Sequence, residues 1–184
     1  MKNAIYLIAS IITISACNNQ YAKKNVADML QADTILYSQQ GKNVTIKYTD
    51  SGFLKAIVFA KVLNGIKKDG NEIIKMPEGV KADFYNKEGI IESYLTANKG
   101  ISYQAQKITE VSENVIVRNN KGEKLNTELL TWDQNKQLIY TDKFVKITTE
   151  KEIITGDGLI GKQDFSEWTI KKPRGIIQIA KDSI

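Results

Sequence analysis

The sequence contains no histidine, one cysteine and two prolines among its 184 residues. Without histidine, a Ser-His-Asp or Cys-His catalytic centre is excluded, and the commonest metal ligand is missing as well. A single cysteine rules out an intrachain disulfide, so apolar burial and sheet hydrogen bonds must hold the fold together. We therefore expect a protein with no catalytic residues and no cofactor.

Carboxylates are the remaining candidates for chemistry. Glycoside hydrolysis needs two acids about 5 to 9 Å apart, and no Asp or Glu pair stands out for it in the sequence. Calcium loops cluster their acids, whereas Asp50, Asp157 and Asp164 are isolated. Gly156-Asp157-Gly158 lacks the Lys-Ser/Thr ending of a phosphate-binding loop. The sequence predicts no metal site, and a glycan-active enzyme is the least favoured reading.

The charge is mildly basic, with 26 Lys and Arg against 21 Asp and Glu. This excess suits an anionic partner such as a phosphorylated glycolipid or a membrane surface, but it is equally consistent with ordinary solubility. The lysines are scattered, and only residues 171–174 (KKPR) form a basic cluster. We expect no nucleic-acid partner.

The N-terminus has the layout of an export signal. One positive charge, at Lys2, precedes an apolar run over residues 4–14, which is too short for the roughly 20 residues of a bilayer span. The run ends in Ile14-Ser15-Ala16-Cys17, which resembles a bacterial lipobox, and this predicts Cys17 as the lipid anchor. An incidental thiol in a short transmembrane anchor is the alternative. We predict a signal peptide over residues 1–16, a lipidated tether over 17–33 and one domain over 34–184.

The rest of the chain has the period of β-strands. Val44, Ile46 and Tyr48 alternate with Thr45 and Lys47, and Val115 and Val117 alternate with Ile116 and Arg118. No sustained helical stripe follows the tether. Glycine-containing turns are predicted at residues 48–52, 85–89, 119–122 and 155–158. Segments that follow these turns echo one another at offsets of 37 and about 30 residues, which is typical of stacked hairpins. The pattern predicts an all-β sheet with open edges, although a closed barrel is an alternative.

Several of these segments, in this order, resemble the LptC family of lipopolysaccharide-export proteins. They are YTDSG at 48–52, PEGVKADFY at 77–85, LTA at 95–97, EVSENVIV at 110–117, KLNTELLTWD at 124–133 and IITGDGL at 153–159. The resemblance covers residues 45–177. It implies a twisted antiparallel β-jelly-roll, open at both ends and like OstA and LptA, built here from hairpin repeats.

The resemblance also implies a function and partners. The interior would shelter the acyl chains of lipopolysaccharide between an inner-membrane Lpt ABC transporter, at the N-terminal edge, and a periplasmic LptA-like bridge protein, at the C-terminal edge. The protein would sit in the periplasm, held to a membrane, the inner one favoured, by its lipid. Well-known members carry an N-terminal transmembrane helix in place of a lipobox. The regulatory contacts that this helix makes with the transporter are therefore in doubt for this chain.

Period-two alternation selects the residues expected to line the lipid groove. They are Phe84, Leu95, Ala97, Tyr103, Val115, Val117, Leu125, Val145, Ile147 and Ile154. Ordinary core packing is the competing interpretation for each residue, and Trp132 and Trp168 either sit at the groove mouth or pack in the sheet. The rival for the whole protein is a structural envelope lipoprotein or adhesin whose sheets pack fully and leave no groove.

Overall fold

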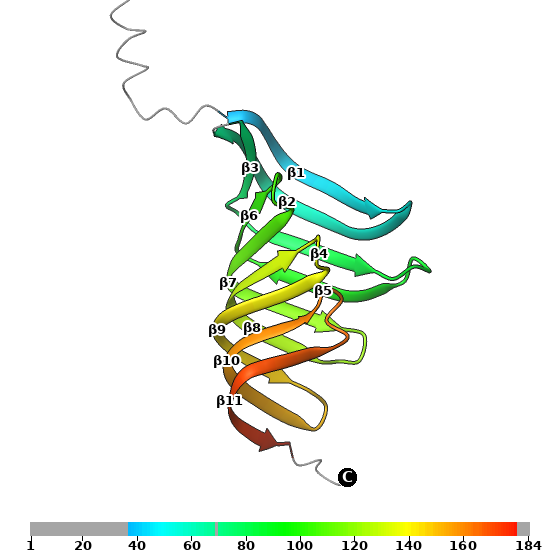
Figure 1. Cartoon of the computed structure of the whole chain (residues 1–184), viewed down its shortest axis with the longest axis vertical. Helices are drawn as coiled ribbons and strands as arrows, with labels where there is room; N and C mark the ends of the chain where they lie inside the picture. The colour runs from blue at the N-terminus through cyan, green and yellow to red at the C-terminus, as the bar shows by residue number, and fades with distance from the viewer. Residues whose placement is uncertain (1–36, 69, 180–184) are drawn as a thin grey trace, which may run out of the picture. The chain divides into compact units, whose positions relative to one another are not determined.

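The computed structural model describes residues 37–68 and 70–179, and all of its regular structure there is β-strand (Figure 1). The predicted signal peptide, Cys17 and the tether lie outside these residues. The eleven strands are β1 (Tyr37–Asp50), β2 (Phe53–Lys68), β3 (Asn71–Met76), β4 (Val80–Tyr85), β5 (Ile91–Ala97), β6 (Lys99–Tyr103), β7 (Ile108–Asn119), β8 (Lys124–Asp133), β9 (Leu138–Thr148), β10 (Glu152–Lys162) and β11 (Trp168–Gln178). The predicted all-β fold is confirmed.

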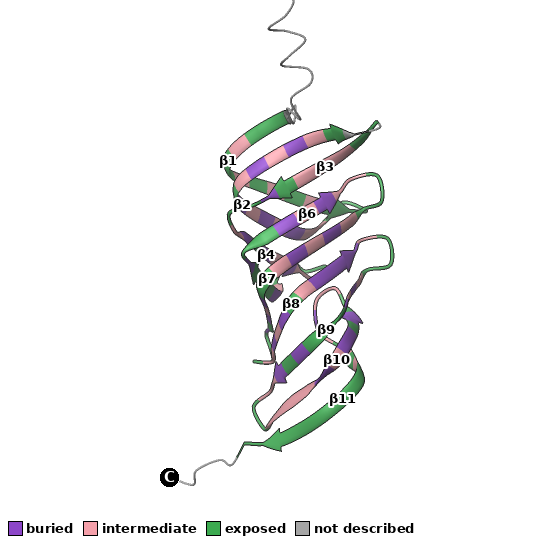
Figure 2. Ribbon diagram, turned by 90° about the vertical axis from the view of Figure 1, so that its left-hand side faces the viewer, coloured by how far each residue is buried: buried purple, intermediate pink, exposed green. Residues whose placement is uncertain are grey.

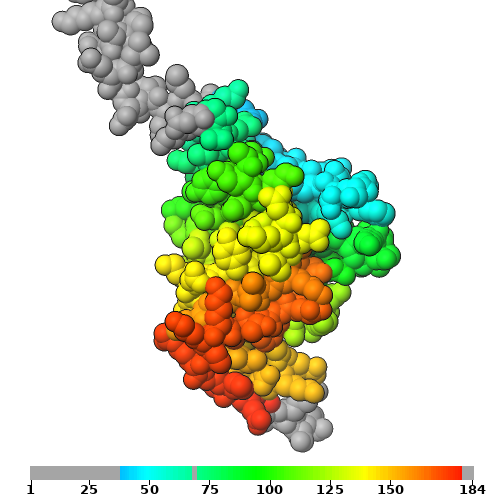
Figure 3. Space-filling model, in the orientation of Figure 1, coloured from blue at the N-terminus to red at the C-terminus, as the bar shows by residue number. Residues whose placement is uncertain are grey.

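All strand pairs are antiparallel and form one sheet, in the order β11-β10-β9-β8-β7-β5-β4-β2-β3-β6. β6 also pairs with β7, so hydrogen bonding runs in a ring through β2, β3, β6, β7, β5 and β4. Among the described residues, β1 pairs only with β2, and β11 pairs only with β10. The space-filling view shows the strands stacked as successive bands between these two edges (Figure 3). This is the open jelly-roll that the sequence predicts.

The long strands fold the sheet into two facing layers because each changes its pairing partner or its register near its middle. The first half of β2 pairs with β4 and its last part with β3, while the first half of β7 pairs with β6 and its second half with β5. In β7 the change falls at Glu113 and Asn114, two non-glycine residues with positive φ that form a bulge. Such a bulge bends a strand. We call the half of the sheet that contains β4 and β5 layer A, and the half that contains β3 and β6 layer B.

The strands after β7 repeat this bend and extend both layers. Register shifts occur between Thr127 and Thr131 in β8 and between Asp157 and Leu159 in β10. The predicted hairpin turn at residues 155–158 is therefore wrong, since these residues lie inside β10. Gly158, with φ +74°, supplies the mid-strand bulge rather than a chain reversal. The three other predicted turns are confirmed between β1 and β2, β4 and β5, and β7 and β8.

The core lies between the two layers and runs along the stack (Figure 2). β4, β5 and the ends of β7 alternate buried with exposed residues, as a strand with one face inward must. β11 is the exception, because its last eight residues, from Lys171 to Gln178, are all exposed. The C-terminal edge of the sheet therefore presents both apolar and basic side chains to solvent.

Candidate functional site

Eight of the ten residues predicted to line a groove lie together in the buried core between the layers. They are Phe84, Leu95, Ala97, Val115, Val117, Leu125, Val145 and Ile147. Four of them form one cross-strand row, since Val117 pairs with both Leu95 and Leu125, and Leu125 pairs with Ile147. Alternation alone was enough to find these residues because all eight lie on layer A, in strand segments that keep one inward register.

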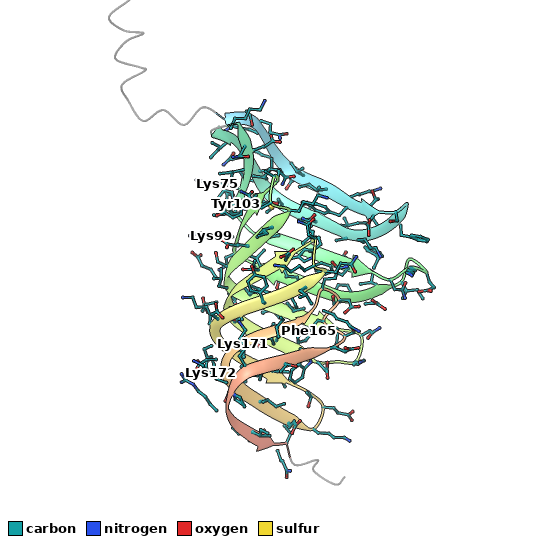
Figure 4. All side chains as sticks on the ribbon, in the orientation of Figure 1. Lys75, Lys99, Tyr103, Phe165, Lys171 and Lys172 are labelled. Carbon is teal, nitrogen blue, oxygen red and sulfur yellow. The ribbon has the colours of Figure 1, made fainter. Side chains whose placement is uncertain are left out.

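Ile154 and Tyr103 differ from the other eight. Ile154 pairs with buried Ile147 and continues the inward row, but it is only half-buried because its other partner, Ile176, is exposed at the end of the stack. Tyr103 lies on the outer face, since Ser102 is the buried neighbour in β6. It shares a flank with Lys75 and Lys99 (Figure 4). Tyr103 therefore does not line the interior.

Three aromatic rings meet at the centre of the interior. Trp132, from the layer B half of β8, contacts Phe84 of layer A edge to face, with ring centroids 5.3 Å apart. It contacts Tyr48 of β1 in the same way at 5.4 Å. The Trp132 Nε1 donates a hydrogen bond to the Gln163 Oε1 at 3.0 Å. Trp132 thus joins the layers: it packs in the core and also borders the mouth of the interior.

The space left between the layers is small and apolar. A cavity of about 20 Å³ lies among core side chains that include Val58, Phe84 and Trp132, and it presents no polar surface. That is room for about one water molecule. Any larger apolar guest therefore requires the layers to separate.

The ends of the strands open onto two wider clefts at the mouth between the layers. One, of about 360 Å³, is floored by Trp132 and flanked by Lys55 and Lys107. The other, of about 460 Å³, also contains Lys55 and lies beside Glu92 and Asp164. The first cleft is predominantly polar and the second is mixed, so the mouth is amphipathic: charged side chains surround an entrance to an apolar interior.

Three acidic side chains, Glu88, Glu92 and Asp164, line this second cleft, and Glu92 interacts most strongly with Asp164. Burial is the main cause that raises the pKa of Glu92, and the negative charge and hydrogen bond of Asp164 raise it further. Two carboxyl groups that share a hydrogen bond are closer than the roughly 5 Å that glycoside hydrolysis requires. The pair therefore lacks the spacing of a glycosidase centre, and the described residues contain no group of three side chains suited to a metal ion.

Phe165 is the most important interior residue that the sequence did not reveal. It is fully buried although it lies in the loop between β10 and β11, outside any alternating run. It stacks on Trp168, with ring centroids 6.2 Å apart. Periodicity cannot find a core residue in a loop, and no other sequence pattern marked it.

A bent antiparallel sheet that encloses an apolar interior and leaves both edge strands unpaired on one side defines an open β-jelly-roll. The chain belongs to the LptC family: the model of lipopolysaccharide-assembly, LptC-related proteins matches residues 4–176. No individually curated relative matches the chain. Membership gives it a role in lipopolysaccharide transport, in a family of periplasmic, inner-membrane-associated proteins that act as non-enzymatic transport components. The described residues form no helix long and apolar enough to cross a membrane.

Proposed function

We propose that this protein accepts lipopolysaccharide extracted by an inner-membrane ABC transporter and passes it along a periplasmic jelly-roll bridge toward the outer membrane. The acyl chains lie between layers A and B, where they are stabilised by about 25 cal/mol for each Å² removed from water. The protein contributes a sheltered path and no chemistry. The observation that supports this most directly is the continuous inward row from Leu95 through Val117 and Leu125 to Ile147 and Ile154.

The two edge strands are the proposed docking surfaces. An edge strand offers unpaired N–H and C=O groups that a partner strand can extend by β-augmentation. β1 is proposed to meet the transporter, and β11 the next jelly-roll of the bridge. Ile176 and Ile177 support the second assignment, because both are more than 60% exposed at the end of the apolar row. Cys17 is proposed to carry the lipid that holds the protein at the membrane.

One observation favours the rival, a structural lipoprotein with a fully packed interior. The remaining cavity is about 20 Å³, far less than an acyl chain occupies. The two functions differ in whether layers A and B separate to admit a lipid. The test must therefore detect lipid in the interior while the transporter is active in the cell.

Photocrosslinking in living cells makes this test. The photoreactive residue p-benzoylphenylalanine replaces Phe84, which is buried between the layers. A matched control places it at Phe144, an aromatic residue of β9 that is half exposed and whose neighbour Val145 faces inward. Lipopolysaccharide adducts are detected by immunoblotting.

We expect adducts at position 84, none at 144, and loss of the signal when the transporter's ATPase is disabled. Thermal melting of each purified full-length variant confirms that it is folded. Absence of adducts at 84 in a folded protein would move the assignment to the packed structural lipoprotein.

A further inference from the structure

The loop between β10 and β11, residues 163–167, forms hydrogen bonds to turns of both layers, which no other hairpin loop in the described part of the chain does. Because β8 bends at its middle, its two ends lie on different layers: the turn before it belongs to layer A and the turn after it to layer B. The loop is hydrogen bonded to both of these turns. It therefore bridges the open side of the folded sheet.

On layer B the loop continues the sheet. The Gln163 N–H donates to the Gln137 carbonyl at 3.1 Å, beside the β8–β9 turn, and the Gln163 side chain accepts from the Trp132 Nε1 at 3.0 Å. Lys162 and Leu138 are already paired in the adjoining strands. This side of the loop is anchored to its own layer by ordinary sheet contacts.

On layer A, the loop makes two hydrogen bonds to the β7–β8 turn, and Trp168, the first residue of β11, makes a third. The Asn119 Nδ2 donates to the Phe165 carbonyl at 3.0 Å, the Lys121 Nζ donates to the Ser166 carbonyl at 3.1 Å, and the Trp168 Nε1 donates to the Glu123 carboxylate at 3.2 Å. Asn119 itself is held by a second bond to Glu123 at 2.7 Å. Glu92 of β5 meets Asp164 as well, so two layer A hairpins contact the loop.

Phe165 carries the apolar part of this contact. Its backbone has φ +56°, a left-handed conformation that is costly for a bulky residue, yet its side chain is completely buried. Figure 4 shows it toward the middle of the stack, away from the flank that carries Lys171 and Lys172. A strained loop conformation that inserts an aromatic ring is stable only while its surrounding contacts persist, which is the property of a closure that can release.

We propose that residues 163–167 are a latch that closes the open side of the interior, with Phe165 as its plug. Its catch is formed by the bonds of Asn119 and Lys121 to the loop and the bond of Glu123 to the adjoining Trp168. Release of the catch lets layers A and B separate and admits an apolar chain from the side, rather than only through the end of the stack. This rests on the proposed lipid-carrying function, which requires a route into an interior that is closed in this structure.

A reversible chemical lock tests the latch in the full-length protein. Lys121→Cys and Ser166→Cys, whose native side chain and carbonyl are bonded across the mouth, are joined by a short, reducible bis-methanethiosulfonate reagent. Each single-cysteine variant, treated in the same way, controls for Cys17. Two probes then report on the interior: lipopolysaccharide adducts from p-benzoylphenylalanine at Phe84, and the fluorescence of N-phenyl-1-naphthylamine, a small apolar dye.

We expect the lock to reduce both signals at least fivefold and reduction of the reagent to restore them. In the opposite direction, Trp168→Phe keeps the ring stack but removes the bond to Glu123. This should speed dye entry roughly tenfold, about what one hydrogen bond to a charged acceptor is worth in an opening equilibrium.

The outcomes separate the latch from the lipid-carrying function. If the locked protein takes up dye and forms adducts as readily as the released one, the latch is wrong while the function stands. If the lock blocks dye entry but no state yields lipopolysaccharide adducts, the latch stands and the function fails. If neither probe enters in any state, the interior does not open and the latch is overturned.

Discussion

Phe84 and Trp132 meet edge to face across the interior, with ring centroids 5.3 Å apart and ring planes at 84°. Their strands, β4 and β8, are not neighbours in the sheet, so this contact joins layers A and B directly. Edge-to-face pairs contribute about 0.5 to 1.5 kcal/mol beyond the area that they bury. We call this contact the joint between the layers. Trp132 borders the mouth and both rings line the apolar cavity, so the joint lies on the proposed lipid path.

Truncation of this joint should destabilise the fold strongly. Trp132→Ala removes contacts to Phe84, Tyr48 and Gln163 together, so we expect the free energy of unfolding to fall by about 3 to 5 kcal/mol. Urea unfolding of the full-length protein measures the change. Tyr94→Ala, at a half-exposed ring on the outer face, should cost less than about 0.5 kcal/mol. Equal losses for both variants would contradict a joint between the layers.

The sequence predicted the strands and most of the interior because both depend on local alternation. Eight inward residues from Phe84 to Ile147 were found this way, as were three glycine turns. Tyr103 was misplaced because β6 turns Gly100 and Ser102 inward, and only the pairing with β7 shows that. The latch could not be predicted, because Phe165 belongs to no repeating pattern. Its hydrogen-bond partner, Asn119, lies 46 residues away in the sequence.

Gly156 was predicted to form a turn, but the structure gives its small size a different role. A methyl group there would lie 2.5 Å from both the Lys172 carbonyl oxygen and the Ile170 Cγ2, so β11 could not approach β10. We expect Gly156→Ala to lower the free energy of unfolding by about 1 to 3 kcal/mol, through overpacking. Gly175→Ala, which meets only the Thr155 hydroxyl at 3.7 Å, should change it by less than about 0.5 kcal/mol. Thermal melting compares the two variants. If Gly156→Ala melts like wild type, β11 does not pack this closely against β10.

Two buried serines should respond to alanine substitution with opposite signs. The Ser93 hydroxyl has no hydrogen-bond partner among the described residues, whereas the Ser102 hydroxyl is bonded to Thr109 and to Gln104, each at 2.9 Å. Ser93→Ala should raise the free energy of unfolding by about 1 kcal/mol, because it removes a desolvated polar group. Ser102→Ala should lower it by about 1 to 3 kcal/mol, because it leaves the Thr109 hydroxyl unpaired. Chemical denaturation distinguishes these signs, and a loss at Ser93 would show that its hydroxyl is paired in solution.

Asp133 should make the protein lose stability in acid. Hydrogen bonds from the side chain and backbone of Lys136 lower the pKa of Asp133 below its ordinary value of 3.8. The ionised carboxylate therefore stabilises the fold above that value, and this contribution is lost as the pH falls through the lowered pKa. Asp133→Asn keeps an acceptor for the Lys136 N–H but removes the charge. Urea midpoints should differ between wild type and variant at neutral pH and converge in strong acid, and a constant difference would contradict the charge effect.

Glu92 should have the opposite pH dependence and should report on the latch. Burial and the neighbouring Asp164 raise the pKa of Glu92 above its ordinary value of 4.5, so the folded protein holds the proton more tightly than the unfolded chain does. Stability is therefore fully present below that value and is lost as the pH rises through the raised pKa. Glu92→Gln removes this loss, since an amide can bond to Asp164 without a second negative charge. We expect the variant to melt at a higher temperature than wild type at neutral pH, with the difference disappearing below the ordinary value. Glu128→Gln, which changes an exposed acid on β8, should alter the melting temperature little at either pH.

The same substitution at Glu92 should also change access to the interior. At neutral pH, Glu92→Gln should slow the entry of N-phenyl-1-naphthylamine, because the contact between β5 and the latch is stronger. Faster dye entry in a more stable variant would contradict this prediction. It would mean that the contact between Glu92 and Asp164 affects stability locally and does not hold the latch closed.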